Sequence, residues 1–313
     1  MIITTCPQAW QDTGAYWALK HLEVTGKTKH IPWEQLQDQD GDLIISCGIG
    51  EIDLLRLRKK GRKIGVLFCS PLAQAHVVPS SLNGDLDALL RYKNMLKSGD
   101  IDYIFLLSER LTYLFKNEKI IYLPPALQWD LQPKNSFNVE DRKSICFFGT
   151  SDKHKNLATM FGAIKYSSVE DPFVITGQEK VQMCQFFANL FDMKNITLYP
   201  RLQRQQLLDL MNTVRLGIQI SFSESFNYST WELAMLSIPS VVSPSISWYV
   251  EDSTLKKFCF IENLDNPILI GEKIKKIYFD SILYKDLCIL SKNIAVSVME
   301  NNNNKVVKLL EKI

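Results

Sequence analysis

The sequence lacks the features that mark a membrane-spanning or secreted chain. Charged residues interrupt every apolar run before it reaches the roughly 18 residues that span a bilayer. The first residues, MIITTCPQAWQDTG, contain no basic stretch followed by an apolar one, which a secretory signal requires. We therefore expect a cytoplasmic protein with no membrane span.

An excess of charge of one sign and a metal-binding pattern are also lacking. The chain carries 36 Lys and Arg against 34 Asp and Glu, so its net charge of +2 gives no general attraction for nucleic acid. The seven cysteines form an odd set without a C-x-x-C pair and lie mostly in apolar runs, which predicts buried free thiols. The four histidines lack the spacing of zinc ligands. We expect neither a nucleic-acid partner nor a metal cofactor.

What is present is an alternation of short apolar runs with segments of helical periodicity, which predicts an α/β fold with parallel sheets. The first set of expected strands is DLIIS (42–46), KIGVLF (63–68), YIFLL (103–107) and KIIYLP (119–124). The second set is SICFF (144–148), FVIT (173–176), ITLYP (196–200), LGIQIS (216–221), PSVVS (239–243) and FCFIE (258–262).

The length of 313 residues suits two domains of about 150 residues each. A polar stretch rich in Pro, Asn and charges separates the two sets of strands. We expect two Rossmann-like domains, an N-terminal one over 1–130 and a C-terminal one over 144–285, joined by a linker over 131–143. Helices over 286–313 are expected to pack back toward the N-terminal domain, with a surface turn at the asparagine run 301–304.

The segment LGIQISFSESFNYSTWELAMLSIPSVVS (216–243) carries the main chemical signal. A strand, a short polar loop and a helix follow one another, and the free N–H groups of a helix start favour a phosphate. Glu224 lies before the helix and Glu232 within it. Two carboxylates near an anion site suit the hydroxyls of a sugar. The alternative is a helix-capping glutamate and an ordinary exposed one.

This segment resembles the S-E-G-F-G-x4-E-A-M-A-x-G-x-P-V-V motif of the retaining glycosyltransferases of family 4. The matching positions are Ser223-Glu224, Phe226, Glu232, Ala234-Met235, Pro239 and Val241-Val242. The resemblance implies the GT-B fold, two Rossmann-like domains whose parallel sheets face a cleft. It also implies that Glu224 engages the donor sugar and Glu232 the nucleotide ribose.

Three residues depart from the motif, since Ser225, Asn227 and Ser237 stand where the family has glycine. Asn227 can preserve the backbone turn, because asparagine tolerates positive φ better than most residues. Ser225 has no such explanation. With their neighbours Phe226 and Tyr228, Ser225 and Asn227 are expected to line the donor site.

A second stretch, CFFGTSDKHKNLATMFGAI (146–164), resembles the family's G-R-x4-K signature. The resemblance places Gly149 and the catalytic Lys155 at the donor's diphosphate, where a fixed ammonium stabilises the charge of the leaving group. Thr150 replaces the signature's arginine. Lys153 could supply the second positive charge, or Thr150 could bind phosphate through its hydroxyl alone. Taken by itself, this basic stretch would be a solvated loop.

Further residues enter by the same resemblance. FVITG (173–177) resembles a strand that ends in a glycine beside the donor, which places Gly177 there. Arg201 and Leu202 would line the nucleobase pocket. Arg201 and Arg204 could equally be surface charges at a helix start.

The N-terminal half resembles the family in architecture alone. The acceptor-side candidates are Gly14, His76, Ser108 and Glu109. For His76 the alternative is a capped or surface histidine. Two D-x-D triplets, 38–40 and 85–87, have the spacing used for Mg²⁺ in the other glycosyltransferase fold, and we interpret them as surface turns.

A run of cations, RLRKKGRK, spans 56–63. Its members are Arg56, Arg58, Lys59, Lys60, Arg62 and Lys63. They could dock on anionic lipid at the inner membrane face, where each cation contributes about 1 kcal/mol. The alternative is a helix C-terminus stabilised by cations before a glycine stop.

The sequence thus predicts a hexosyltransferase that moves a sugar, with retention and without a metal, from a nucleoside-diphosphate donor to a hydroxyl. The expected acceptor is a glycan, a glycolipid or a lipid-linked molecule, as in polysaccharide biosynthesis. A catalytically silent nucleotide-sugar-binding module and a nucleotide-sugar epimerase are the alternatives.

Overall fold

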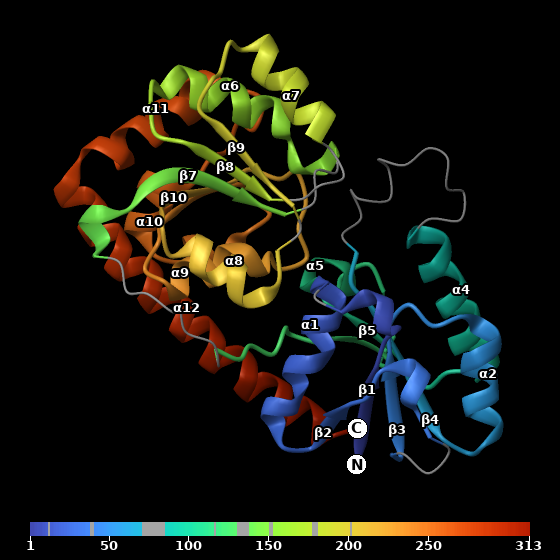
Figure 1. Ribbon diagram of the computed structural model, residues 1–313. Coiled ribbons are helices and arrows are strands. Elements are labelled where there is room, and N and C mark those ends of the chain that lie inside the picture. Colours follow the sequence, from blue (N-terminus) through green and yellow to red (C-terminus); the bar gives the residue numbers. More distant parts are fainter. Residues whose placement is uncertain are drawn as a thin grey trace. The chain divides into compact units, whose positions relative to one another are not determined.

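The computed structural model describes residues 1–11, 13–37, 41–70, 85–115, 117–129, 138–149, 153–176, 181–200 and 202–313. The chain forms two compact units (Figure 1). Unit 1 comprises Met1–Trp129 and Met299–Ile313, and unit 2 comprises Asp130–Val298.

Unit 1 is built on a six-stranded, fully parallel sheet in the order β2-β1-β3-β4-β5-β6. Its strands are β1 (Ile2–Thr5), β2 (Thr28–His30), β3 (Leu43–Ser46), β4 (Lys63–Phe68), β5 (Tyr103–Leu106) and β6 (Ile120–Tyr122). The four apolar runs predicted for this half are β3 to β6. The first two strands were not expected: β1, with the sequence IITT, has only two apolar residues, and β2, with the sequence TKH, has none.

The helices of unit 1 connect these strands and cover the sheet (Figure 1). They are α1 (Gly14–Lys20), α2 (Glu51–Lys59), α4 (Asp85–Ser98) and α5 (Glu109–Thr112). The apolar core between α2, α4 and the sheet includes Leu54, Ile64 and Ile104, all inaccessible to solvent. The prediction of a turn at 85–87 is wrong, because these residues begin α4, where Asp87 pairs with Arg91 one helical turn later. The triplet at 38–40 lies outside the described residues.

Unit 2 contains a five-stranded parallel sheet in the order β11-β10-β7-β8-β9. Its strands are β7 (Lys143–Phe148), β8 (Phe173–Thr176), β9 (Ile196–Tyr199), β10 (Val214–Gln219) and β11 (Ser240–Val242). Its helices are α6 (Leu157–Ser167), α7 (Val181–Leu190), α8 (Arg204–Met211), α9 (Tyr228–Met235), α10 (Ser253–Cys259) and α11 (Pro267–Phe279). In Figure 1, α6 and α7 lie on one face of this sheet, and α8 and α9 lie on the other.

The strand order of unit 2 determines where its loops can form a site. From β7 the chain proceeds outward to β8 and β9, and then returns to the other side of β7 to form β10. The order reverses between β7 and β10, and ligands of open α/β sheets bind outside the carboxyl ends of the strands at such a switch point. The loops that follow β7 and β10 contain most of the predicted donor residues, including Lys155 and Glu224.

The predicted strand at 258–262 is wrong. Asp252 caps a helix there by accepting hydrogen bonds from the backbone N–H groups of Thr254 and Leu255, and α10 continues to Cys259. Only an isolated bridge from Phe260 to Val242 remains of the expected pairing.

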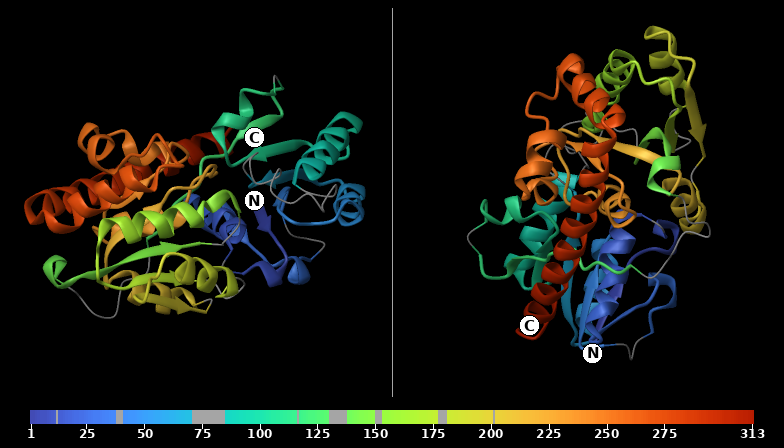
Figure 2. Two further views of the ribbon diagram at one scale, coloured as in Figure 1. Left: turned by 90° about the horizontal axis from the view of Figure 1, so that it is seen from above. Right: turned by 90° about the vertical axis from the view of Figure 1, so that its left-hand side faces the viewer.

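The surface turn predicted at the asparagine run is also wrong. The run lies inside α12 (Ser281–Leu310), which Figure 2 shows as one continuous helix. Asn303 hydrogen-bonds to both backbone groups of Leu127, at 2.9 Å each, and Asn302 donates to the carbonyl of Pro125. These side-chain amides satisfy the hydrogen-bonding groups of the backbone at Pro125 and Leu127 in unit 1. This role explains why polar residues occupy this part of the helix.

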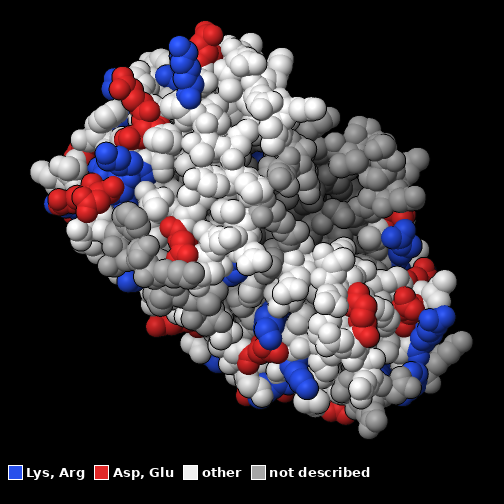
Figure 3. All heavy atoms as spheres, viewed as in Figure 1, with Lys and Arg blue, Asp and Glu red and all other residues white. Residues whose placement is uncertain are grey.

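The distribution of charged side chains and the burial of the free cysteines agree with the expectations from the composition. The face of the molecule in Figure 3 shows Lys, Arg, Asp and Glu interspersed over the described residues. All seven cysteines are free, and six of them are buried while Cys69 is half-buried. Among the described residues, no helix combines the length and the apolar character needed to cross a membrane.

Candidate functional site

The loops after β7 and β10 are joined at the carboxyl edge of the unit 2 sheet. The backbone N–H of Phe222 donates a 2.7 Å hydrogen bond to the carbonyl oxygen of His154. One residue further along its loop, Lys155 extends its ammonium to Glu224, with 2.5 Å between Nζ and Oε1. The side chains of Lys155 and Glu224 are only 12% and 8% exposed, so this ion pair is largely shielded from solvent.

The loop that carries Lys155 ends in a helix start of unusual geometry. Residues Lys153–Lys155 form a short 3-10 helix, and Asn156 follows with a φ of 58° as the N-cap of α6. The Asn156 amide donates a 2.7 Å hydrogen bond to the carbonyl of Leu264. Asparagine is among the few residues that tolerate positive φ. The backbone turn at Asn156 and its hydrogen bond to Leu264 hold the end of the loop next to Lys155 in place.

The loop that carries Glu224 is fixed by a second asparagine. Asn227 has a φ of 69° and caps α9 by accepting from the Thr230 N–H at 2.9 Å. Its amide also donates to Gln219 at the end of β10, and Gln219 in turn donates to the carbonyl of Phe148 in β7. The expectation that Asn227 preserves the backbone turn is confirmed. Ser237 likewise has a φ of 58° at the third glycine position of the motif.

Aromatic rings support the same loop. The ring of Phe226 stacks on Trp248 at a centroid distance of 5.4 Å, and Tyr228 packs edge-on against it at 5.2 Å. The indole N–H of Trp248 donates to the backbone carbonyl of Phe226. Phe226 is therefore a buried anchor of the loop, and Trp248, which the sequence did not indicate, holds it in place.

Helix α9 packs closely on the sheet at Gly217 of β10. A Cβ atom at Gly217 would overlap the hydroxyl of Ser240 in β11 and a methyl group of Leu233 in α9, so these side chains would have to shift to admit it. Glu232 lies next to Leu233 on this closely packed helix.

Glu232 is 4% exposed and forms an ion pair with Arg204, the first residue of α8. Burial raises the pKa of the Glu232 carboxyl above its ordinary value, and the nearby Arg204 guanidinium partly opposes this shift. The Arg204 side chain is only 15% exposed, so its interpretation as a surface charge is wrong. Nothing in the sequence spacing linked it to Glu232, because the two residues belong to different helices.

The carboxyl end of β10 also presents a buried hydroxyl. Ser221 follows this strand, is inaccessible to solvent, and its Oγ has no hydrogen-bond partner in the described part of the chain. Buried polar atoms in native proteins are nearly always hydrogen-bonded, to protein, water or ligand. Ser221 is a polar group of this edge that the sequence did not indicate.

The remaining donor-site predictions fall into two groups. Gly149, Leu202 and Ser225 are described, with Gly149 directly after β7, Leu202 between β9 and α8, and Ser225 next to Glu224. The predicted residues outside the described part are Thr150, Gly177 and Arg201, together with the side chain of Lys153. In the structure Lys155 forms an ion pair with Glu224. Asn227 caps α9, the helix that follows Glu224, and Glu232 lies within that helix.

The acceptor-side candidates belong to unit 1. Gly14 is the first residue of α1, after Thr13 has capped that helix. Ser108 is buried directly before α5, and Glu109 begins that helix as an exposed residue. His76 lies outside the described residues. Gly14 begins α1, whereas Ser108 and Glu109 lie at the start of α5, so they stay separate candidates.

The basic run forms a helix end, as its structural interpretation predicted. Helix α2 ends at Lys59 and Gly61 follows with a φ of 79°. Arg58 pairs with Asp102 at 2.7 Å. Arg62 donates to the carbonyl of Gly41, Lys63 to that of Ile313, and Arg56 pairs with Asp53.

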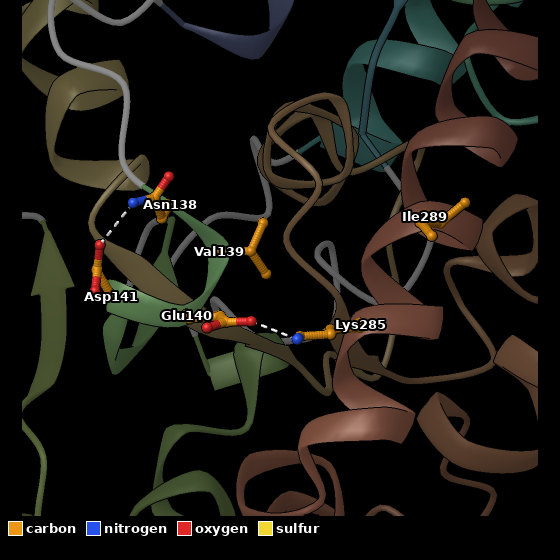
Figure 4. Close-up of a pocket in the computed structure, with 6 residues that line it drawn as sticks. All are labelled: Asn138, Val139, Glu140, Asp141, Lys285 and Ile289. Atoms are coloured by element: carbon orange, nitrogen blue, oxygen red, sulfur yellow. Dashed lines mark hydrogen bonds and ion pairs between the residues drawn. The ribbon is translucent and has the colours of Figure 1, made fainter.

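A pocket elsewhere in unit 2 contrasts with this site. It has a volume of about 550 Å³ and shares no residue with the donor-site candidates (Figure 4). Its lining consists of Asn138, Val139, Glu140, Asp141, Lys285 and Ile289. The Glu140–Lys285 pair across it is exposed to solvent, so this pocket offers no shielded charge. The described residues contain no group of three or more His, Cys, Asp or Glu side chains placed to hold a metal ion.

Sequence comparison finds no relatives, since no protein-family model and no curated protein matches the chain. Solved structures are similar in fold. HepE of Anabaena, in complex with UDP-glucose, matches with a TM-score of 0.77 at 12% identity, over 100% of both chains. Sucrose-phosphate synthase of Thermosynechococcus elongatus matches at 0.72 and 11% identity, over 100% of this chain and 98% of the other.

A third similar structure is that of S. aureus TarM, in complex with fondaparinux, α-GlcNAc-glycerol and UDP. It matches with a TM-score of 0.64 at 14% identity, over 92% of this chain but 59% of TarM. This chain therefore spans little more than half of TarM. Together these matches confirm the predicted GT-B fold, in which two α/β units each contain a parallel sheet.

Proposed function

We propose that this protein is a retaining glycosyltransferase that transfers a hexose from a nucleoside-diphosphate donor to a hydroxyl group. The observation that carries the proposal is the pair of buried ion pairs, Lys155–Glu224 and Arg204–Glu232, beside the switch point of unit 2. The proposal is also supported by the similar structures, which contain UDP in TarM and UDP-glucose in HepE.

In the proposed reaction, Lys155 stabilises the negative charge that develops on the leaving diphosphate. A fixed ammonium in a shielded site is worth most where charge develops in the transition state. Gly149, Thr150 and Lys153 belong to the same loop and would contact the phosphates. The loop needs no metal ion in this scheme, because Lys155 itself supplies the positive charge.

The two carboxylates receive hydroxyl groups of the donor. Glu224 would accept hydrogen bonds from the sugar and Glu232 from the ribose, with Ser225 to Tyr228 as the wall between them. Leu202 and Arg201 would lie against the nucleobase, and Gly177 beside the donor. Retention follows if the leaving phosphate itself takes the proton of the acceptor hydroxyl, so that no protein base is required.

The acceptor is proposed to bind unit 1, near Gly14, His76, Ser108 and Glu109. A glycan, a glycolipid or a lipid-linked molecule would each present the required hydroxyl, and polysaccharide biosynthesis is the corresponding role. A lipid-linked acceptor would be reached at the inner membrane face. The ion pair of Arg58 with Asp102 engages one cation of the basic run within unit 1, which would reduce the contribution of the run to binding anionic lipid.

A silent nucleotide-sugar-binding module is the alternative that a specific observation favours. Thr150 replaces the second cation of the signature, and Lys155 is already neutralised by Glu224. Such a module would bind the donor without turning it over.

The test is donor turnover followed by ¹H NMR of the product. UDP-glucose, UDP-GlcNAc, GDP-mannose and ADP-glucose are supplied with a panel of glycan and lipid-linked acceptors. We expect one donor to be consumed, and its anomeric configuration to be retained in the product. Nucleotide binding without turnover of any donor would support the silent module, and an inverted anomeric centre would contradict the retaining mechanism.

A further inference from the structure

The ammonium group proposed to hold the donor's diphosphate is occupied by a carboxylate. Lys155 Nζ lies 2.5 Å from Glu224 Oε1, and both side chains are largely buried. The partners come from two different loops, which the hydrogen bond between Phe222 and His154 holds together. A diphosphate cannot take this ammonium without competing with Glu224.

We propose that Glu224 acts in product release, by competing with the nucleoside diphosphate for Lys155 once the sugar has left. The proposal rests on the proposed function and gives Glu224 a role beyond contact with the sugar. It makes the Lys155–Glu224 pair a device that distinguishes the intact donor from the spent nucleotide.

The physical basis is the cost of leaving a buried carboxylate without a partner. When an intact donor binds, its sugar hydroxyls donate to Glu224 and replace the contact with Lys155. When the nucleoside diphosphate alone binds, no hydroxyl replaces it, and an unpaired buried charge is strongly unfavourable. The apparent affinity for the product falls in proportion to the small fraction of molecules in which Lys155 is free.

The second ion pair cannot make this distinction. Glu232, paired with Arg204, is proposed to bind the ribose, which donor and product both carry. Its contribution is therefore equal for the two ligands and cancels in the ratio of their affinities. The difference in affinity between the donor and the product therefore comes from Glu224.

Calorimetric titration of UDP, GDP and ADP into the wild type and the Glu224→Gln variant tests the proposal. We expect the variant to bind the preferred nucleoside diphosphate about tenfold more tightly, or about 1.4 kcal/mol. The same variant should bind the corresponding nucleotide sugar more weakly, because the amide accepts sugar hydroxyls less well. Product inhibition of turnover should become stronger in parallel.

Two further variants separate competition for Lys155 from simple charge repulsion. In a Lys155→Met background, the Glu224→Gln change should no longer tighten nucleotide binding, because no ammonium remains to be released. Tightening of equal size in both backgrounds would identify repulsion and overturn the proposal. Glu140→Gln is the matched control, since Glu140 pairs with Lys285 at an exposed position, and we expect no change in affinity.

The outcomes also distinguish this proposal from the proposed function. If the wild type binds a nucleotide and Glu224→Gln does not bind the diphosphate more tightly, the release role fails and the donor site stands. If no nucleotide binds either protein, both fail. Should Glu224→Gln fold poorly by circular dichroism, Glu224→Asp retains the charge with a shorter reach, and tighter binding of the diphosphate by a smaller factor is expected; its absence would overturn the proposal.

Discussion

The two units share a sheet design but equip their switch points differently. In unit 1 the strand order reverses between β1 and β3, and the residues that follow these strands are Cys6 and Cys47. Burial, chiefly, raises the pKa of Cys6 to about 12, so its thiol is neutral at physiological pH. In unit 2 the equivalent edge between β7 and β10 presents ammonium and carboxylate groups.

This difference is the reason why we place the proposed nucleotide-sugar site in unit 2. The Cys47 and Cys69 sulfurs lie 3.8 Å apart, and the Trp10 ring packs against Gly48, so unit 1 offers a thiol-lined, aromatic edge. These cysteines are largely buried, whereas the ion pairs of unit 2 belong to the donor site proposed above. The same fold thus yields two chemically distinct edges, as expected when function depends on the loops.

The largest effect that would test this contrast is expected at Lys155. Replacing Lys155 with Met removes the ammonium proposed to stabilise the charge of the leaving group, so donor turnover should fall about 100- to 1,000-fold. Steady-state assays with the preferred nucleotide sugar measure this loss. The counterpart in unit 1, Cys47→Ser, should leave turnover within about twofold. Equal losses in both variants would remove the proposed asymmetry.

The next effect concerns the buried pair behind the donor site. Replacing Arg204 with Met leaves Glu232 without its partner, which should destabilise the folded protein by about 3 kcal/mol in urea unfolding. The matched control is Arg56→Ala, which breaks an exposed pair with Asp53 and should cost below about 0.5 kcal/mol. A small loss at Arg204 would show that this pair contributes no more than a surface pair.

The pH dependence of stability provides a second test of the buried Glu232 carboxyl. Burial raises the folded-state pKa of Glu232 above its unfolded value, so the protonated form favours folding. Its contribution is complete below about pH 4.5 and is lost as the pH rises through the raised pKa. Stability measured from pH 4 to 8 should therefore fall more steeply in the wild type than in Glu232→Gln. Parallel curves would contradict the assignment.

The smallest effect is expected at the loop's turn. Asn227→Ala removes the cap of α9 and replaces asparagine with a residue that tolerates positive φ less well, which should cost about 1 to 2 kcal/mol. Asn227→Gly loses the cap but accepts the φ, so it should cost only a few tenths of a kcal/mol. Urea midpoints compare the two, and the reverse order would mean that the φ at Asn227 is not what selects this residue.

Much of the architecture was predictable because strands of parallel sheets appear as short, continuous apolar runs. The prediction failed where other interactions decide. Asp252 caps a helix that extends into the apolar run at 258–262, and Asn302 and Asn303 hydrogen-bond to backbone groups from within a helix that the polar run did not predict. A local sequence pattern does not show which distant group a side chain will hydrogen-bond to.

The site shows the same limit. The motifs indicated Lys155, Glu224 and Glu232 as separate residues, but not that Glu224 would neutralise Lys155. Arg204 was considered only as a surface charge at a helix start, and its pairing with Glu232 of α9 depends on the three-dimensional fold. Ion pairs between distant segments depend on the fold, so a single sequence does not reveal them.

Nucleotide binding tests the central claim most directly, that unit 2 contains a donor site built around Lys155. Thermal unfolding is followed with UDP, GDP, ADP and CMP for the wild type and Lys155→Met. A ligand at 100 times its dissociation constant adds about 2.7 kcal/mol, so at least one nucleoside diphosphate should raise the unfolding temperature of the wild type by several degrees. The shift should be much smaller in Lys155→Met. No shift with any nucleotide, or an equal shift in both proteins, would contradict the account.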